Sequence, residues 1–154
     1  MNKRILFLTG TRADYGKLKP LISTLAGSFE VHIFVTGMHM LKVFGSTFLE
    51  VKKDGFKNVF LFVNQRTDDH LDQILAKTIS GFSDYIRETP PDMIIVHGDR
   101  VEALAGSIVG AMNNILVAHV EGGEVSGTID ESIRHAISKF AHIHFVSNTI
   151  AKTR

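Results

Sequence analysis

The chain has 154 residues, 44% of them hydrophobic and 21% charged, which suits one soluble domain with a sizeable core and leaves no room for two. Its formal net charge of +1 gives no support to a nucleic-acid-binding or membrane-binding surface. The sequence contains no cysteine, so disulfides, thiolate metal sites and a cysteine nucleophile are excluded.

The N-terminal stretch Met1 to Arg4 is basic, as in a signal peptide, but the apolar run Ile5 to Leu8 is too short for the hydrophobic region of one. No stretch approaches the roughly 20 apolar residues that span a bilayer. We therefore expect a cytoplasmic protein with no membrane partner.

Short apolar runs, several of them β-branched, predict strands that are covered on both faces of a parallel sheet. They lie at residues 5–9, 31–36, 59–63, 93–97, 116–120 and 143–146. Between them, apolar residues at helical spacing predict helices over residues 18–25, 71–86, 103–112 and 133–140. This alternation predicts an α/β fold, a Rossmann-like, doubly wound parallel sheet, and we expect the strand order 3-2-1-4-5-6.

Two parts of the chain are less regular. Glycines interrupt weak helical patterns between Thr36 and Val59, which predicts a short helix pair or a mobile loop. Asn148 predicts a helix cap just after the sixth strand. Only six residues follow Asn148, so we expect the fold to continue beyond this chain.

In open α/β sheets the ligand lies beyond the carboxyl ends of the strands, and the loop from Gly10 to Lys17 follows the first strand. It is neither a phosphate-binding P-loop nor a dinucleotide fingerprint, because its glycine spacing fits neither motif. Its backbone N–H groups and the cations Arg12 and Lys17 could still meet an anion. A purely structural alternative is a tight turn in which Asp14 caps the helix and pairs with Arg12.

Carboxylates follow the fourth and fifth strands. Asp99 lies in the segment His97-Gly-Asp-Arg100, and its structural alternative is the N-cap of the next helix. Glu121 ends a buried strand against two glycines, where a carboxylate has no obvious structural task. Glu121 is therefore the most suggestive single residue.

A further group of polar residues opens the helix before the last strand. Asp130 and Glu131 lie where the helix dipole favours acids, and Arg134 and His135 lie one turn further on. The histidines show no zinc-like spacing with a third ligand, so we expect core or network roles for them and no metal site. Carboxylates at three strand ends, with cations in the first loop, suit acid–base work on an anionic substrate.

Together these motifs resemble those of the hydrolysing UDP-N-acetylglucosamine 2-epimerase family, most closely its sialic-acid-pathway branch. The resemblance spans essentially the whole chain. It is carried by Thr9-Gly-Thr-Arg-Ala-Asp-Tyr-Gly-Lys17, His97-Gly-Asp-Arg100 and, above all, His119-Val-Glu-Gly-Gly-Glu-Val-Ser-Gly-Thr-Ile-Asp-Glu-Ser-Ile-Arg-His135.

The resemblance implies that residues 1–154 form the N-terminal, Rossmann-like half of a GT-B arrangement. The C-terminal half of family members, which carries most uridine and diphosphate contacts and a catalytic-site histidine, has no counterpart in this sequence. We therefore expect the chain alone to be inactive. The resemblance further implies a UDP-sugar substrate, no cofactor and a homodimer.

In the implied reaction UDP leaves C1 of UDP-N-acetylglucosamine and the C2 proton is removed, which gives 2-acetamidoglucal. Water then adds with inverted configuration at C2 to give N-acetylmannosamine. The two proton transfers need positioned groups. The matching motifs imply Asp99, Glu121 and Glu131 as catalytic residues, with Asp130 as an alternative to Glu131, and leave base and acid unassigned.

The same motifs imply the substrate-binding residues. Arg12, Asp14 and Lys17 in the first loop would bind the substrate, with the two cations meeting the diphosphate, and Arg134 and His135 would bind sugar or phosphate oxygens.

Several alternatives stay open. The same chemistry on a bacillosamine-type UDP-sugar fits the motifs as well, since such substrates are poorly separated by sequence. Half of a GT-B glycosyltransferase would need only one catalytic base in this domain. A non-catalytic nucleotide-sugar-binding module would keep the loop and do no chemistry. A receiver-like signalling domain would need an acidic pair beside Asp99 at the first strand end, and the sequence offers none.

Overall fold

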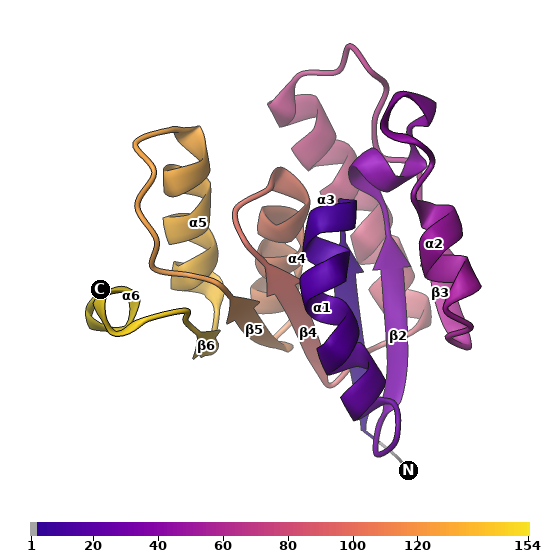
Figure 1. Ribbon diagram of the computed structural model, residues 1–154, viewed down its shortest axis with the longest axis horizontal. Helices are drawn as coiled ribbons and strands as arrows, with labels where there is room; N and C mark the ends of the chain where they lie inside the picture. The colour runs from indigo at the N-terminus through magenta and orange to yellow at the C-terminus, as the bar shows by residue number, and fades with distance from the viewer. Residues whose placement is uncertain (1–2) are drawn as a thin grey trace.

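A computed structural model of the chain describes residues 3–154, so the first two residues of the basic N-terminal stretch lie outside it (Figure 1). Strands and helices alternate along the chain. In order they are β1 (Arg4–Thr9), α1 (Arg12–Leu25), β2 (Glu30–Val35), α2 (Phe48–Lys53), β3 (Asn58–Leu61), α3 (Leu71–Glu88), β4 (Met93–His97), α4 (Val101–Met112), β5 (Leu116–Val120), α5 (Ile129–Phe140), β6 (Ile143–Phe145) and α6 (Thr149–Thr153).

All six strands form one parallel sheet with the order β3-β2-β1-β4-β5-β6, which confirms the predicted topology. Phe7 of the central strand pairs with Ile33 of β2 on one side and with Ile95 of β4 on the other. From β1 the chain continues to β2 and β3 on one side of the sheet, and it then adds β4, β5 and β6 on the other side, so the strand order reverses between β1 and β4. Ligands of open α/β sheets bind at this kind of switch point.

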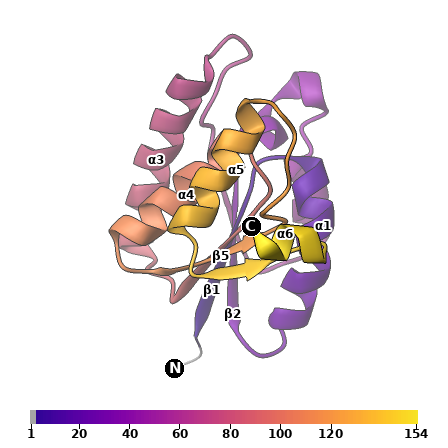
Figure 2. The same ribbon diagram turned by 90° about the vertical axis from the view of Figure 1, so that its left-hand side faces the viewer.

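Helices cover both faces of the sheet, as Figures 1 and 2 show. The face that carries Leu6 and Leu8 packs against α3, α4 and α5, and its core includes Phe34 and Phe82. The face that carries Ile5 and Phe7 packs against α1 and α2. Successive strand residues point to opposite faces of the sheet. Since helices cover both faces, the residues on both faces must be apolar, and this explains the uninterrupted apolar runs of the sequence.

The irregular segment between β2 and β3 contains two 3-10 helices, Gly37–Met40 and Lys42–Phe44, followed by α2. The segment therefore consists of short helices, in line with the predicted helix pair and not with the alternative of a mobile loop. The predicted helix cap at Asn148 is confirmed, because its Oδ1 accepts a hydrogen bond of 2.8 Å from the Ala151 N–H. No helix within residues 3–154 is long and apolar enough to cross a bilayer.

Helix starts were predicted less well than strands. The first helix begins at Arg12 instead of Leu18, since Thr11 caps it and its side chain accepts from the Asp14 N–H at 3.2 Å. The fifth helix begins at Ile129, before the first apolar position Ile133, and its first turn contains Asp130 and Glu131, as predicted. In both cases polar first turns precede the apolar positions that set the helical pattern.

Candidate functional site

A cavity of about 490 Å³ opens at the carboxyl ends of β1, β4 and β5, at the switch point of the sheet. We call it the central cavity. Its volume falls in the range of about 300–1,000 Å³ that is typical of ligand pockets. Its lining residues are Thr11, Ala13, Asp14, Lys17, Met38, His97, Gly98, Asp99, Arg100, Glu121, Glu124 and Arg134.

Glu121 lines this cavity and contacts two of its other lining residues. Its Oε2 lies 2.6 Å from Lys17 Nζ and 3.2 Å from His97 Nε2. Partial burial alone would raise the pKa of Glu121, but the hydrogen bond from Lys17 and the nearby His97 outweigh burial and hold this pKa below its ordinary value. The carboxylate is therefore ionised in the resting site.

The backbone at Glu121 is strained, with φ at 62°. Residues other than glycine rarely adopt this left-handed conformation, and such strain clusters at functional sites. The Glu121 N–H still bonds to the Phe145 carbonyl at 2.8 Å, so the turn is tied to β6. The next residue must be glycine, because a Cβ on Gly122 would lie 2.8 Å from His119 Nδ1.

Asp99 forms an ion pair with Arg134 across the cavity. The guanidinium of Arg134 also donates to the Glu124 carbonyl at 2.8 Å, and its side chain is only 10% exposed. The N-cap of α4 is Arg100, so the structural alternative for Asp99, a helix cap, is wrong. Asp99 therefore lies beside a cation in the lining of the central cavity.

His119 fixes the loop that carries Asp99. The ring is fully buried, its Nε2 lies 2.7 Å from the Gly98 carbonyl and its Nδ1 lies 3.1 Å from Ser138 Oγ. Burial lowers the pKa of His119 to about 4, so the ring is neutral near pH 7. Since a carbonyl can only accept, Nε2 carries the proton and Ser138 donates to Nδ1. The predicted network role of this histidine is confirmed.

The polar residues of the loop after β1 differ in their roles, because some line the central cavity and others stabilise the fold. Asp14 accepts hydrogen bonds from the Gly10 N–H at 3.0 Å and from Thr9 Oγ1, and it completes the capping box of α1. The predicted capping role of Asp14 is thus confirmed, but its predicted pairing with Arg12 is wrong. Arg12 lies 3.1 Å from Glu50 of α2 and is 72% exposed, outside the residues that line the central cavity.

Glu131 also lies outside this lining set. Its Oε2 accepts hydrogen bonds from the Gly127 N–H at 2.6 Å and the Ser126 N–H at 2.9 Å, which lower its pKa. Asp130 beside it is exposed. The observed contacts of Glu131 close the turn before α5, and its catalytic role stays a prediction.

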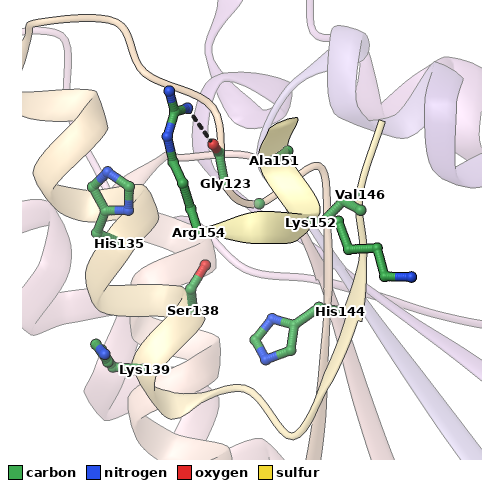
Figure 3. A pocket seen from close by; sticks show the side chains of 10 residues that line it. Gly123, His135, Ser138, Lys139, His144, Val146, Ala151, Lys152 and Arg154 are labelled. Atoms are coloured by element: carbon green, nitrogen blue, oxygen red, sulfur yellow. Dashed lines mark hydrogen bonds between the residues drawn. The ribbon is translucent and has the colours of Figure 1, made fainter. Parts of the chain in front are cut away.

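His135 lines a different cavity of about 470 Å³ between α5, β6 and α6, which we call the second cavity. Figure 3 shows His135 and Lys139 from α5, His144 from β6 and the hydrogen bond of 2.9 Å from Arg154 to the Gly123 carbonyl. The fold therefore brings five of the predicted site residues together in the central cavity, namely Asp14, Lys17, Asp99, Glu121 and Arg134. It places Arg12, Glu131 and His135 outside the lining of that cavity.

Sequence reasoning assigned no site role to three ionisable residues that line the central cavity, namely His97, Arg100 and Glu124. Each follows or ends a strand, so the rule for strand ends could have found them. Within residues 3–154, no three histidine, aspartate or glutamate side chains are grouped so that they could hold a metal ion.

A family model described as UDP-N-acetylglucosamine 2-epimerase matches residues 24–154. A UDP-N-acetylglucosamine 2-epimerase of Neisseria meningitidis serogroup B is 51% identical, over 99% of this chain and 41% of the relative. A UDP-N,N'-diacetylbacillosamine 2-epimerase (hydrolyzing) of Legionella pneumophila is 38% identical, over 100% of this chain and 42% of the relative. The crystal structure of the Methanocaldococcus jannaschii UDP-GlcNAc 2-epimerase with UDP-GlcNAc and UDP superposes with a TM-score of 0.84 at 25% identity, over 97% of this chain and 42% of that one. The chain thus spans about two fifths of the length of these relatives.

Proposed function

The chain belongs to the UDP-N-acetylglucosamine 2-epimerase family, and from this membership we propose that it is the N-terminal domain of a hydrolysing UDP-N-acetylglucosamine 2-epimerase. The reaction converts UDP-N-acetylglucosamine and water to N-acetylmannosamine and UDP. We propose that the domain works with a second domain that supplies most uridine contacts, and that it is inactive alone. A homodimer and a place in sialic-acid synthesis stay predictions of the resemblance, and a cytoplasmic location stays a prediction from the apolar runs of the sequence.

One observation carries this proposal. Two carboxylates from different strand ends, Asp99 and Glu121, line the same cavity at the switch point, each beside a cation. An elimination followed by hydration needs two proton-transfer groups and positive charge near the leaving group. The central cavity offers both.

In the first step the C1–O bond breaks, UDP departs with the bonding electrons, and a carboxylate takes the C2 proton as the C1–C2 double bond forms. In the second step water adds its hydroxyl to C1 and gives up a proton to solvent, while a carboxylic acid that has taken up a proton from solvent delivers it to C2 from the opposite face. We assign the first proton transfer to Glu121, because it is ionised in the resting site. Asp99 is the candidate for the second.

The contact between Lys17 and Glu121 couples substrate binding to the proposed proton transfer. A diphosphate that enters the cavity competes for the Lys17 ammonium, which lies 2.6 Å from Glu121 Oε2. When Lys17 turns to the phosphate, Glu121 loses the hydrogen bond that lowers its pKa. The carboxylate thereby becomes a stronger base only when substrate is present.

A second substrate is favoured by one comparison. The relative from Legionella pneumophila is named for UDP-N,N'-diacetylbacillosamine and is 38% identical. The same carboxylates would serve this sugar, because the reacting C1 and C2 positions are alike. Turnover of one UDP-sugar in preference to the other decides between the two substrates.

The test follows UDP-N-acetylglucosamine by proton NMR in D2O. The chain is assayed alone and in a fusion in which it replaces the segment that it matches in the Neisseria meningitidis relative. We expect the fusion to release UDP and N-acetylmannosamine with deuterium at C2, and Glu121→Gln or Asp99→Asn to lower kcat about 100-fold or more. The control is Glu88→Gln, an exposed position at the end of α3. A folded fusion that binds the sugar without turnover would favour the non-catalytic module.

A further inference from the structure

His39 is a fully buried histidine that the proposed reaction does not use. It lies in the 3-10 helix Gly37–Met40 after β2, and its ring packs edge-on against the ring of Tyr15. This helix is pressed against the loop after β1, since the His39 N–H bonds to the Gly10 carbonyl at 3.3 Å and a Cβ on Gly37 would lie 2.6 Å from the same oxygen. The backbone that carries the ring is therefore fixed beside the loop that begins α1.

Both ring nitrogens of His39 have hydroxyl partners. Nε2 lies 3.0 Å from Thr9 Oγ1, and Nδ1 lies 2.7 Å from Thr47 Oγ1. Burial lowers the pKa of His39, and the nearby Asp14 carboxylate opposes this only in part, so the ring is neutral near pH 7. A neutral imidazole donates from one nitrogen and accepts at the other, so the partners decide the direction of the two hydrogen bonds.

The Asp14 carboxylate sets that direction. It is an acceptor, since its Oδ2 takes a hydrogen bond of 3.0 Å from the Gly10 N–H, and Thr9 Oγ1 donates to its Oδ1. A hydroxyl has one proton to give, so Thr9 must accept from Nε2 of His39. Nδ1 of the ring is then left to accept from the Thr47 hydroxyl.

We infer that His39 is a positioning residue of the central cavity, and that it acts through Thr9 on Asp14 with its proton on Nε2. A series of hydrogen bonds thereby runs in one direction, from the Thr47 hydroxyl to the Asp14 carboxylate. Asp14 closes the capping box of α1 and lines the central cavity, which Lys17 of the next turn also lines. The ring thus ties the first two turns of α1 to the segment after β2. The catalytic use of this arrangement rests on the proposed function, but the series of hydrogen bonds does not.

Nitrogen-15 NMR of the histidine rings in the full chain tests the direction of this series, because it reports which ring nitrogen carries the proton. At pH 7 we expect a neutral His39 ring with the proton on Nε2. A ring protonated on Nδ1, or on both nitrogens, overturns the inference. The measurement needs no substitution and no ligand.

Two amide variants test whether His39 acts through Thr9. The asparagine amide is attached to Cγ, as Nδ1 is, and the glutamine amide lies one bond further out, as Nε2 does, so only His39→Gln keeps a donor for Thr9. Carbon-13 NMR of the Glu121 carboxyl group reports the effect: burial alone would raise its pKa and the hydrogen bond from Lys17 opposes this, so a loosened contact gives a higher pKa. His39→Asn should raise the pKa of Glu121, and His39→Gln should leave it nearly unchanged. In the fusion, His39→Asn should lower kcat/KM about tenfold or more, and His39→Gln less than about threefold.

His32→Asn is the matched control. His32 is also buried and has partners at both ring nitrogens, 2.9 Å from Tyr85 Oη and 2.8 Å from Glu30 Oε1, but it lies within β2 and outside the lining of the central cavity. This variant should lower the melting temperature and leave the pKa of Glu121 and kcat/KM nearly unchanged. Equal changes in His39→Asn and His39→Gln, or in His39→Asn and His32→Asn, overturn the positioning role and leave the proposed function standing. A fusion without turnover contradicts the proposed function, and the two NMR measurements on the chain still decide the role of His39.

Discussion

Replacing His119 with glutamine should reduce the loss in the free energy of unfolding that occurs as the pH is lowered. In the folded chain the buried ring has a pKa of about 4, against 6.5 for an ordinary histidine. Above pH 6.5 the ring is neutral in both states. Below that pH the unfolded chain binds a proton that the folded chain does not, so the free energy of unfolding falls as the pH drops from about 6.5 to about 4.

The size of the effect follows from the two pKa values. Each whole step in pKa is worth about 1.4 kcal/mol, so His119 costs the folded state about 3 kcal/mol at full effect and about 2.5 kcal/mol between pH 7.5 and pH 4.5. Glutamine cannot titrate, and its amide can still donate to the Gly98 carbonyl. His119→Gln should therefore lose about 2.5 kcal/mol less than the unsubstituted chain over this interval.

Urea unfolding at pH 7.5 and pH 4.5 measures the difference directly, and any fixed cost of the substitution cancels between the two. His135→Gln is the matched control, because this side chain is 43% exposed and should leave the pH dependence nearly unchanged. If His119→Gln shows the same loss on acidification as the unsubstituted chain, the burial argument for a neutral His119 is refuted.

Three further predictions test other parts of the structure. Lys17→Met should raise the pKa of Glu121, because burial then acts against only the weaker influence of His97; carbon-13 NMR of the Glu121 carboxyl group measures it, and an unchanged pKa would mean that the ion pair does not form in solution. Phe7→Ala should destabilise the fold by about 3–5 kcal/mol, since Phe7 is fully buried in the central strand, whereas Phe60→Ala, at a position 41% exposed, should cost clearly less in chemical unfolding. Asp14→Asn should cost about 1 kcal/mol or more, because a buried acceptor of backbone N–H groups loses its charge; unfolding at neutral pH checks this, and a stable variant would remove Asp14 from the capping box.

The sheet could be predicted from the sequence because its strands are apolar on both faces. Phe7 and Leu8 point to opposite cores, so the run Ile5 to Leu8 reads as buried without alternation. The first turns of helices could not be found in this way. Ile129 starts α5 at a position that is 59% exposed, so no apolar periodicity marks it.

The candidate site was predictable as far as local chain geometry decides it. Glu121 follows a buried strand, and the strand-end rule placed it on the correct rim. The partners of Arg12 and Asp99 were not predictable, because Arg12 pairs with Glu50 and Asp99 with Arg134, both more than 30 positions away in the sequence. Such pairings depend on how α2 and α5 pack on the sheet, and a sequence pattern of short range contains no trace of them.

The central claim is that the cavity between β1, β4 and β5 binds the nucleotide sugar. Nitrogen-15 NMR of the chain, titrated with UDP-N-acetylglucosamine to millimolar concentration, tests it most directly. We predict that the amide signals of Gly98, Asp99 and Glu121 shift together and saturate with one affinity. Shifts confined to His144 and Lys152 in the second cavity, or no shifts at all, would contradict the claim.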